Sequence, residues 1–284
     1  MQILITVLAA LALVLAGLII YDSNRFCVVD YEIESPKIKK DFHFLFLSDL
    51  HNKQYGKDNE KLLAAIDKKC PEAILIGGDI LTATPGKDVT AAARFVRTLA
   101  EKYPVYYANG NHEQRLGLYP DTYGEMGPLY EKLLSEIGIK RLVNAKAEDA
   151  DHGIEVVGCE IDKRFYKRFE RVVMPEDYLP QILPQKNGET YTILLAHNPD
   201  YFEQYVSWGA DLVLSGHVHG GVVRIPYVGG VIATNFRLFP KYDGGLFCKG
   251  KQAMIVSRGL GAHTIPLRLF NPAELVSVVI KKER

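Results

Sequence analysis

The stretch FHFLFLSDLHN, residues 42–52, joins a short apolar run to a cluster of polar side chains. The run Phe42–Leu47 predicts a buried strand, because it is short, apolar and rich in aromatic and aliphatic residues. The polar cluster at 48–52 carries a carboxylate and an imidazole two positions apart. Since side chains alternate along an extended chain, we expect Asp49 and His51 to point to the same side of an extended segment.

The same kind of apolar run recurs along the chain, separated by segments with the apolar spacing of helices. Helices are predicted at 58–69, 88–102 and 201–208, and strands that alternate with helices favour a mostly parallel sheet covered on both faces. In the last third, 221–232, 246–257 and 275–280 predict strands of a second sheet. The short apolar runs that resemble Phe42–Leu47 and alternate with the helices predict further strands at 73–76, 105–108, 191–196 and 212–215.

Five polar clusters follow these predicted strands, and we expect them to meet at one edge of the sheet. In open α/β sheets, ligands bind outside the carboxyl ends of the strands. Five of the eight histidines lie in these clusters, each near glycine, aspartate or asparagine. Imidazole and carboxylate groups without thiolates suit divalent transition metals. The clusters are SDLHN at 48–52, GGD at 77–79, GNHE at 110–113, AHNPD at 196–200 and SGHVHGG at 215–221.

The ordered series D-x-H, G-D, G-N-H-E, H and G-H-x-H resembles the metallophosphoesterase superfamily, also called calcineurin-like phosphoesterases. The resemblance covers about residues 42–258. Together with the apolar N-terminus, the segments FPKY at 239–242 and SRGLG at 257–261 resemble a membrane-associated bacterial branch that includes YkuE-like and YaeI-like phosphodiesterases. The implied fold is α/β, a sandwich of two mixed β-sheets flanked by helices, here with an N-terminal transmembrane helix.

The resemblance implies two divalent metal ions, for which Mn, Fe, Zn, Ni and Co all suit the ligands. A hydroxide bridging the ions would attack phosphorus in line, and the metals would absorb the negative charge that builds on the phosphoryl oxygens. His112 would face the leaving group, stabilising charge on the departing oxygen or protonating it. The first ion would be held by Asp49, His51, Asp79 and His219, and the second by Asp79, Asn111, His197 and His217, with Asp79 as the bridge.

Five residues beside these positions complete the predicted site. Many relatives carry a second Asp three residues after the bridging one, whereas this chain has Thr82. A hydroxyl orients a partner group less strongly than a carboxylate, so Thr82 puts the fine tuning of the site in question. Substrate contacts are expected from Asn52, Arg115, Tyr242 and His263, for which a structural or solvated role is the alternative.

Residues 3–20 form an apolar run without a charge, a length that just allows a helix to cross the hydrocarbon core. No basic residue precedes the run, which disfavours a cleaved signal peptide, and a buried helix of the soluble domain is the other alternative. We expect a single-pass membrane anchor at 1–21, a linker with a possible edge strand at 22–41, and the metallophosphoesterase domain at 42–284. Basic residues after the run favour a cytoplasmic domain; they are Arg25, Lys37, Lys39 and Lys40.

The composition of the whole chain limits its partners. The 284 residues include 34 basic and 34 acidic ones, so no global positive field is present to hold nucleic acid. The four cysteines are far apart and form no C-x-x-C pair, which disfavours a zinc ribbon. The sequence indicates a phosphoester substrate and the membrane as partners, and no feature of it indicates a protein partner.

The predicted function is hydrolysis of a phosphodiester or pyrophosphate, and the expected anchor favours a lipid-linked substrate. A phosphomonoesterase, including a protein phosphatase, is the nearest alternative. A catalytically silent metal-binding scaffold is the second, although His112 and all seven ligand positions are retained. A zinc peptidase or deaminase would require H-E-x-x-H, or H-x-E with P-C-x-x-C, and the sequence contains neither.

Overall fold

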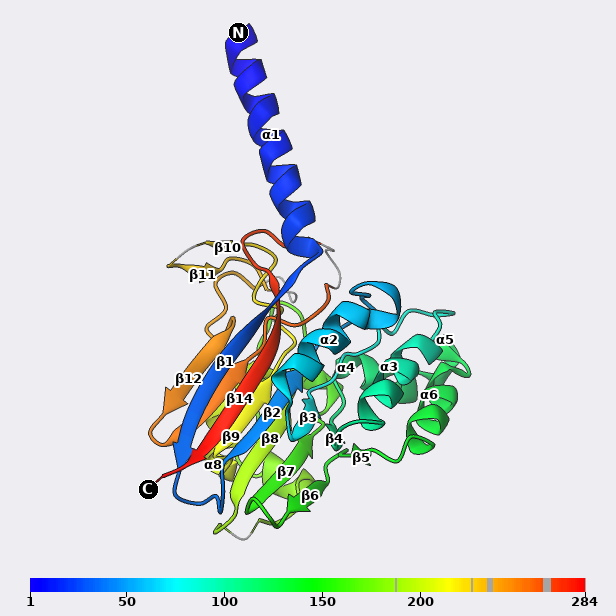
Figure 1. Cartoon of the computed structure of the whole chain (residues 1–284), viewed down its shortest axis with the longest axis vertical. Helices are drawn as coiled ribbons and strands as arrows, with labels where there is room; N and C mark the ends of the chain where they lie inside the picture. The colour runs from blue at the N-terminus through cyan, green and yellow to red at the C-terminus, as the bar shows by residue number, and fades with distance from the viewer. Residues whose placement is uncertain (187, 226, 234–236, 263–266, 284) are drawn as a thin grey trace.

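The computed structural model describes residues 1–186, 188–225, 227–233, 237–262 and 267–283. Two six-stranded mixed sheets pack face to face, and helices cover their outer faces (Figure 1). The predicted α/β sandwich of two mixed sheets is therefore confirmed. The first sheet has the order β1 (Phe26–Ser35), β14 (Ala273–Lys282), β2 (Phe42–Leu47), β3 (Ala73–Ile76), β4 (Val105–Tyr107) and β5 (Lys140–Arg141).

The second sheet mirrors the first in size. Its central strands β13, β9, β8 and β7 are parallel, while β12 and β6 pair antiparallel at the two edges. Its order is β12 (Gly245–Lys249), β13 (Gln252–Val256), β9 (Leu212–Ser215), β8 (Tyr191–Ala196), β7 (Ile154–Cys159) and β6 (Lys146–Asp149). A separate hairpin pairs β10 (Arg224–Ile225) with β11 (Gly229–Gly230).

The continuous apolar run of β2 is explained by burial on both of its faces. Phe44 and Phe46 point between the two sheets, where they join a core that includes Ile193 and Leu214. Leu45 and Leu47 alternate to the outer face and pack into a second core with the helices. The helices of that side are α2 (Glu60–Lys69), α3 (Thr90–Ala100), α4 (Asn111–Leu118), α5 (Pro120–Tyr123) and α6 (Met126–Ser135).

A third core covers the outer face of the second sheet. There Val213 and Val256 contact Phe202 and Tyr205 of α8 (Phe202–Trp208). The short α7 (Tyr178–Ile182) packs beside α8. Three 3-10 turns complete the described elements: η1 (Lys57–Asn59), η2 (Lys163–Tyr166) and η3 (Pro199–Tyr201).

The last third of the chain departs from the strands expected of it. The expected strand at 221–232 is wrong, since among the described residues of this range the strands are the two-residue β10 and β11. The expected strand at 246–257 is instead the hairpin of β12 and β13, because Gly250, at a φ of 62°, reverses the chain between them. Residues 22–41, expected as a linker with a possible edge strand, contain β1, which pairs parallel with β14 at the sheet edge.

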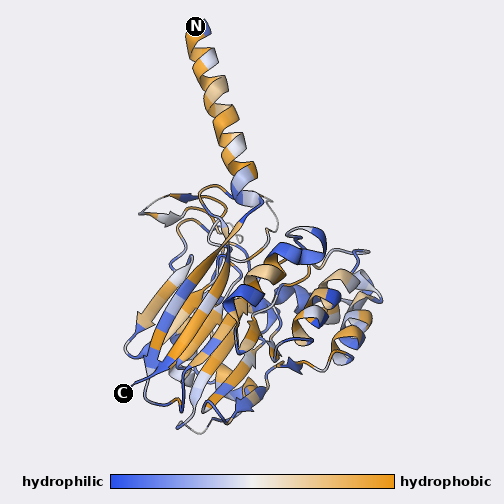
Figure 2. Ribbon diagram, in the orientation of Figure 1, coloured by the Kyte–Doolittle hydropathy of each residue, from blue (hydrophilic) through white to orange (hydrophobic). Residues whose placement is uncertain are grey.

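The N-terminal helix α1 (Gln2–Ser23) projects away from both sheets (Figure 1). Figure 2 shows it as apolar along nearly its whole length, and its most apolar stretch buries nothing against the rest of the chain. A helix of 22 residues is about 33 Å long, enough to cross a bilayer. α1 therefore has the length and composition of a membrane anchor. A signal sequence near an N-terminus has the same length and composition.

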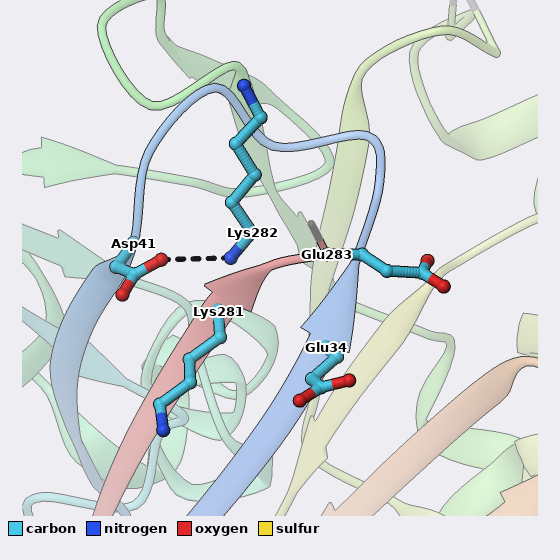
Figure 3. Close-up of a pocket in the computed structure, with 5 residues that line it drawn as sticks. All are labelled: Glu34, Asp41, Lys281, Lys282 and Glu283. Atoms are coloured by element: carbon cyan, nitrogen blue, oxygen red, sulfur yellow. Dashed lines mark hydrogen bonds between the residues drawn. The ribbon is translucent and has the colours of Figure 1, made fainter.

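A pocket at the far end of the first sheet is drawn in Figure 3. It lies where β1 and β14 end and β2 begins. The polar cluster at 48–52 follows the other end of β2. The backbone N–H of Lys282 donates to Asp41 Oδ1 there at 2.9 Å. Its lining of Glu34, Asp41, Lys281, Lys282 and Glu283 mixes both charges and holds none of the predicted site residues.

Candidate metal centre

Carboxylate and imidazole atoms from both sheets meet at the carboxyl ends of β2, β3, β8 and β9. Asp79 Oδ2 lies 3.1 Å from His197 Nε2 and 3.8 Å from His51 Nε2. His51 Nε2 lies 3.2 Å from His219 Nε2, which is 3.3 Å from Asp49 Oδ1. His217 joins Asp79 and His197 in a further group whose donor atoms all lie within 4.8 Å of one another. The donors thus form one continuous cluster with Asp79 near its middle, buried except for the partly exposed His217.

Two buried atoms at the cluster show that its donor set fits cations. Asn111 Oδ1 is buried and meets no hydrogen-bond partner in the part of the chain that the structure describes, and the buried His197 Nε2 has only the Asp79 carboxylate beside it, at 3.1 Å. A buried polar atom without a partner costs about 1–3 kcal/mol, so native proteins rarely leave one unused. Imidazole nitrogen, carboxylate oxygen and amide oxygen are ligands for divalent transition metals. The residues present therefore fit a metal centre of more than one ion.

The backbone at these positions is left-handed, so the prediction of an extended Asp-x-His segment is wrong. Asp49, His51, Asp79, His217 and His219 have φ values of 55°, 50°, 55°, 70° and 52°. This conformation costs a residue with a side chain about 1–2 kcal/mol, and it persists only where surrounding contacts enforce it. Backbone bonds between loops do so here: the Asp49 N–H donates to Gly78 O, the His51 N–H to Asp79 O, and the Gly261 N–H to Asp49 O.

Partners outside the cluster set the orientation of three imidazoles. His197 Nδ1 lies 2.7 Å from the Gly77 carbonyl oxygen, and His219 Nδ1 lies 3.2 Å from that of Gly261. Because a carbonyl oxygen only accepts, each Nδ1 donates, which leaves the Nε2 lone pair for the cluster. His51 Nδ1 lies 3.2 Å from Thr82 Oγ1. Thr82 thus contacts a predicted metal ligand from the position where many relatives have Asp.

His112 presents the opposite tautomer. Its Nδ1 accepts a hydrogen bond of 2.9 Å from the Ala83 N–H, so the proton of the neutral ring lies on Nε2. That Nε2 is 4.0 Å from Asp79 Oδ2. His112 therefore offers an N–H toward the cluster, whereas His197 and His219 offer lone pairs. His112, His51 and Asp79 nevertheless offer donor atoms within 4.8 Å of one another, so the separation of His112 from the metal ligands stays a prediction.

Glu113 is a residue of the site to which the sequence prediction gave no role. One of its carboxylate oxygens accepts from the N–H groups of Asp79 and Gly110, and the other accepts from Ile80 N–H and the Tyr107 hydroxyl. Glu113 thus ties the loop of Asp79 to the start of α4. The signal was present, because a Glu three residues after a helix N-cap is the capping-box pattern.

The charges of the cluster favour the protonation states that metal ligands need at Asp79, His217 and His219, but not at His197. Burial opposes ionisation of Asp79, but His197 and His112 hold the pKa of this carboxyl well below its usual range. Burial lowers the pKa of His217 and of His219, which keeps both rings neutral. At His197 burial is outweighed by the carboxylates of Asp79 and Asp49, which raise its pKa to about 10. A bound metal would have to displace that proton.

Tyr166 of η2 stands beside the cluster without any motif to mark it. Its ring centroid is 5.1 Å from that of His217 and 6.4 Å from that of His197. Burial and the nearby Asp79 raise the pKa of its hydroxyl well above the usual value. Tyr166 therefore keeps its proton and can serve as a hydrogen-bond donor.

The four expected substrate contacts lie in different environments. Asn52 Oδ1 accepts the Thr82 N–H at 2.8 Å, and Arg115 is half-buried one helical turn after Asn111 on α4. Tyr242 is buried between Phe202 and Phe247, and its hydroxyl donates to Glu203 at 3.4 Å. His263 lies outside the residues that the structure describes.

The family model for calcineurin-like phosphoesterases matches residues 42–221, which is more than half of the chain and includes every residue of the cluster. The chain belongs to the calcineurin-like phosphoesterase family. The predicted resemblance is thus confirmed, and the chain is a metallophosphoesterase whose buried His/Asp cluster fits a binuclear metal site. Membership of this family implies a phosphoester substrate.

Three curated relatives illustrate the range of the family around this chain. An uncharacterized metallophosphoesterase of Campylobacter jejuni is 29% identical over 90% of this chain, which spans 64% of the relative's length. Phosphodiesterase YaeI of Escherichia coli is 29% identical over 78% of this chain and 76% of its own length. Metallophosphoesterase YkuE of Bacillus subtilis is 24% identical over 84% of this chain and 79% of its own. Among solved structures, a 5'-nucleotidase precursor of Thermus thermophilus aligns over 85% of this chain and 54% of its own, with a TM-score of 0.44 and 12% identity.

Proposed function

We propose that this chain hydrolyses a phosphodiester or pyrophosphate bond at a two-metal centre, with a lipid-linked substrate. One observation carries the proposal: a continuous cluster of carboxylates and imidazoles, centred on Asp79, that leaves the buried Asn111 Oδ1 without a hydrogen-bond partner among the described residues. The relative named phosphodiesterase YaeI supports the preference for a diester.

The ligands divide into two sets around Asp79. Asp49, His51 and His219 would hold one ion and Asn111, His197 and His217 the other, with Asp79 shared between them. When bound, two such ions polarise a phosphoryl oxygen and supply a water of lowered pKa as the nucleophile. The groups of this chain then have to hold the substrate and manage the leaving oxygen.

His112 is the residue we assign to the leaving group. Because Ala83 fixes its Nδ1 as an acceptor, its Nε2–H points toward the cluster and can donate to the departing oxygen. The backbone N–H of His112 also donates to Asp79 Oδ1 at 2.7 Å, and this bond holds the start of α4 against the cluster. Tyr166 of η2, beside His217, offers a second donor, and we assign the half-buried Arg115 of α4 to an anionic substrate group, which a guanidinium suits.

We further propose that residues 1–21 anchor the chain in the cell membrane as a single pass and that residues 42–284 form the catalytic domain. The exposed apolar surface of α1 supports the anchor. Arg25, Lys37, Lys39 and Lys40, all after the helix, support a cytoplasmic domain. An anchor of this kind keeps the site beside lipid-linked substrates.

The direct test compares bis(p-nitrophenyl) phosphate with p-nitrophenyl phosphate, using the full chain in detergent after chelation and addition of Mn, Zn, Fe, Ni or Co. We expect metal-restored turnover that favours the diester. Preference for the monoester would replace this proposal with a phosphatase. A folded, metal-loaded chain that turns over neither compound would point to a silent scaffold.

A further inference from the structure

The membrane helix and the metal cluster lie at the same end of the molecule. Only Asn24 and Arg25 separate the end of α1 from the start of β1. β1 runs parallel to β14, with Phe26 opposite Ala273, and β14 runs antiparallel to β2, with Val276 opposite Phe46. β2 therefore ends toward the Ala273 end of β14, which is also the end where β1 begins. The cluster that follows β2 thus lies at the same end of the first sheet as the last turn of α1.

Polar contacts fix the end of α1 to the loops that hold the cluster. The Ser23 hydroxyl accepts the Arg268 N–H at 3.1 Å. The buried guanidinium of Arg268 donates to the carbonyls of Arg258, Gly259 and Gly261, and Gly261 O is the partner of His219 Nδ1. The helix is therefore attached to the site by a short, bonded connection.

Three loops at this end expose a set of large apolar side chains, here called the apolar rim. The loops are bonded to one another, since the Arg224 N–H donates to Leu269 O and the Phe239 N–H donates to Val231 O. Figure 1 shows β10 and β11 level with the last turn of α1. The rim consists of Ile225, Tyr227, Val228, Leu238, Phe239 and Phe270, and Tyr227 is completely exposed.

The rim also adjoins the cluster directly. β10 begins five residues after His219. Asn271, next to Phe270, donates from Nδ2 to the carbonyls of His219 and Gly221. Soluble proteins rarely expose a contiguous group of large apolar residues, and such groups mark binding surfaces. At the level where a spanning helix leaves the hydrocarbon core, the fitting partner is the bilayer interface, where tyrosine and other aromatic side chains are enriched.

We infer that the apolar rim enters the interface of the leaflet from which α1 emerges, so that the metal cluster faces the bilayer and acts on the phosphate of a lipid headgroup. This inference rests on the anchor and the phosphoesterase activity proposed above. Two attachment points, one spanning and one interfacial, would prevent the domain from rotating the cluster away from the membrane.

Fluorescence quenching tests the position of the rim in the full chain. In a Trp208→Phe background, a single tryptophan replaces Tyr227 or, as a matched control, Cys248, which is exposed on β12 at the opposite end of the second sheet. Each protein is reconstituted in phosphatidylcholine vesicles with or without bromine on the acyl chains. We expect bromine to quench the tryptophan of Tyr227→Trp several-fold more than that of Cys248→Trp. Equal, weak quenching in protein that floats with the vesicles would overturn the inference while leaving the anchor in place.

Hydrolysis by a charged variant provides the second measurement. In vesicles carrying phosphatidyl-p-nitrophenol, water adds to phosphorus and the bond to the nitrophenyl oxygen breaks, giving phosphatidic acid and nitrophenol. We expect Tyr227→Asp with Val228→Asp to reduce this rate several-fold and to leave soluble bis(p-nitrophenyl) phosphate turnover unchanged. Unchanged hydrolysis of both compounds would overturn the inference. If the wild-type chain did not float with the vesicles, the anchor would be overturned as well. If the wild-type chain hydrolysed neither the lipid nor bis(p-nitrophenyl) phosphate, the proposed activity would be overturned.

Discussion

Replacing Gly259 with alanine tests whether the loop after β13 holds the metal ligands in place. Gly259 has a φ of 70°, and a Cβ at this position would lie 2.7 Å from Asp49 Cβ and 3.3 Å from His219 Nδ1. Gly138 is a matched control, because its φ is 75° and an added Cβ would meet nothing within 4 Å. Gly138→Ala therefore measures the cost of backbone strain alone, and the additional effect of Gly259→Ala measures the contact with Asp49 and His219.

The expected losses of unfolding free energy follow from these distances. Strain at a left-handed residue costs about 1–2 kcal/mol, which is the full effect expected of Gly138→Ala. Carbon atoms normally approach to about 3.5–4.0 Å, so Gly259→Ala must also displace Asp49 by up to about 1 Å, at an overpacking cost of about 1–3 kcal/mol. Gly259→Ala should thus lose about 2–5 kcal/mol of unfolding free energy.

Metal binding should respond more strongly than stability. Ligand distances tolerate only about 0.2 Å of error, and disturbing the groups that orient ligands typically weakens metal affinity by about 10–100-fold. Urea unfolding, metal titration and diester hydrolysis of both variants provide the comparison. If Gly259→Ala matched Gly138→Ala in stability and in metal affinity, the assignment of this loop to the metal centre would be refuted.

Three further substitutions separate the roles around the cluster. His112→Ala should retain metal and slow turnover by about 10²–10⁴-fold, and loss of metal content would show that it is a ligand. Thr82→Val removes the hydroxyl that contacts His51 Nδ1 and should weaken metal affinity by about 10–100-fold. Thr82→Ser keeps a hydroxyl and should bind metal as the wild type does. Equal metal affinities of the two variants in a titration would contradict the role of the hydroxyl. Tyr166→Phe should leave metal content unchanged and alter kcat or KM for the diester, and unchanged kinetics would remove Tyr166 from the site.

The sequence predicted the elements whose patterns are local. Phe42–Leu47 alternates between two cores, so its apolar run follows directly from burial on both faces. The five polar clusters lie at strand ends as expected, because parallel strands bring their carboxyl ends to one edge. Both sheets contribute to that edge, and this arrangement allows Asp79 and His197 to meet although 118 residues separate them.

The backbone of the site could not be predicted because distant residues impose it. Asp49 is left-handed through bonds to Gly78 and to Gly261, which lies more than 200 residues away, and an alternating pattern contains no trace of such bonds. Thr82 likewise looked like a departure, but its contact with His51 emerges only from the folded loop. Tyr166 approaches His217 from a segment without periodicity or motif.

The central claim is that the cluster around Asp79 binds two metal ions that support phosphoester hydrolysis. Its most direct test is elemental analysis of the full chain beside Asp79→Ala, with diester turnover measured on the same samples. We predict two ions per chain and metal-dependent turnover in the wild type, and loss of both in a folded Asp79→Ala variant. Full turnover by Asp79→Ala, or a folded wild type that binds no metal, would contradict the account.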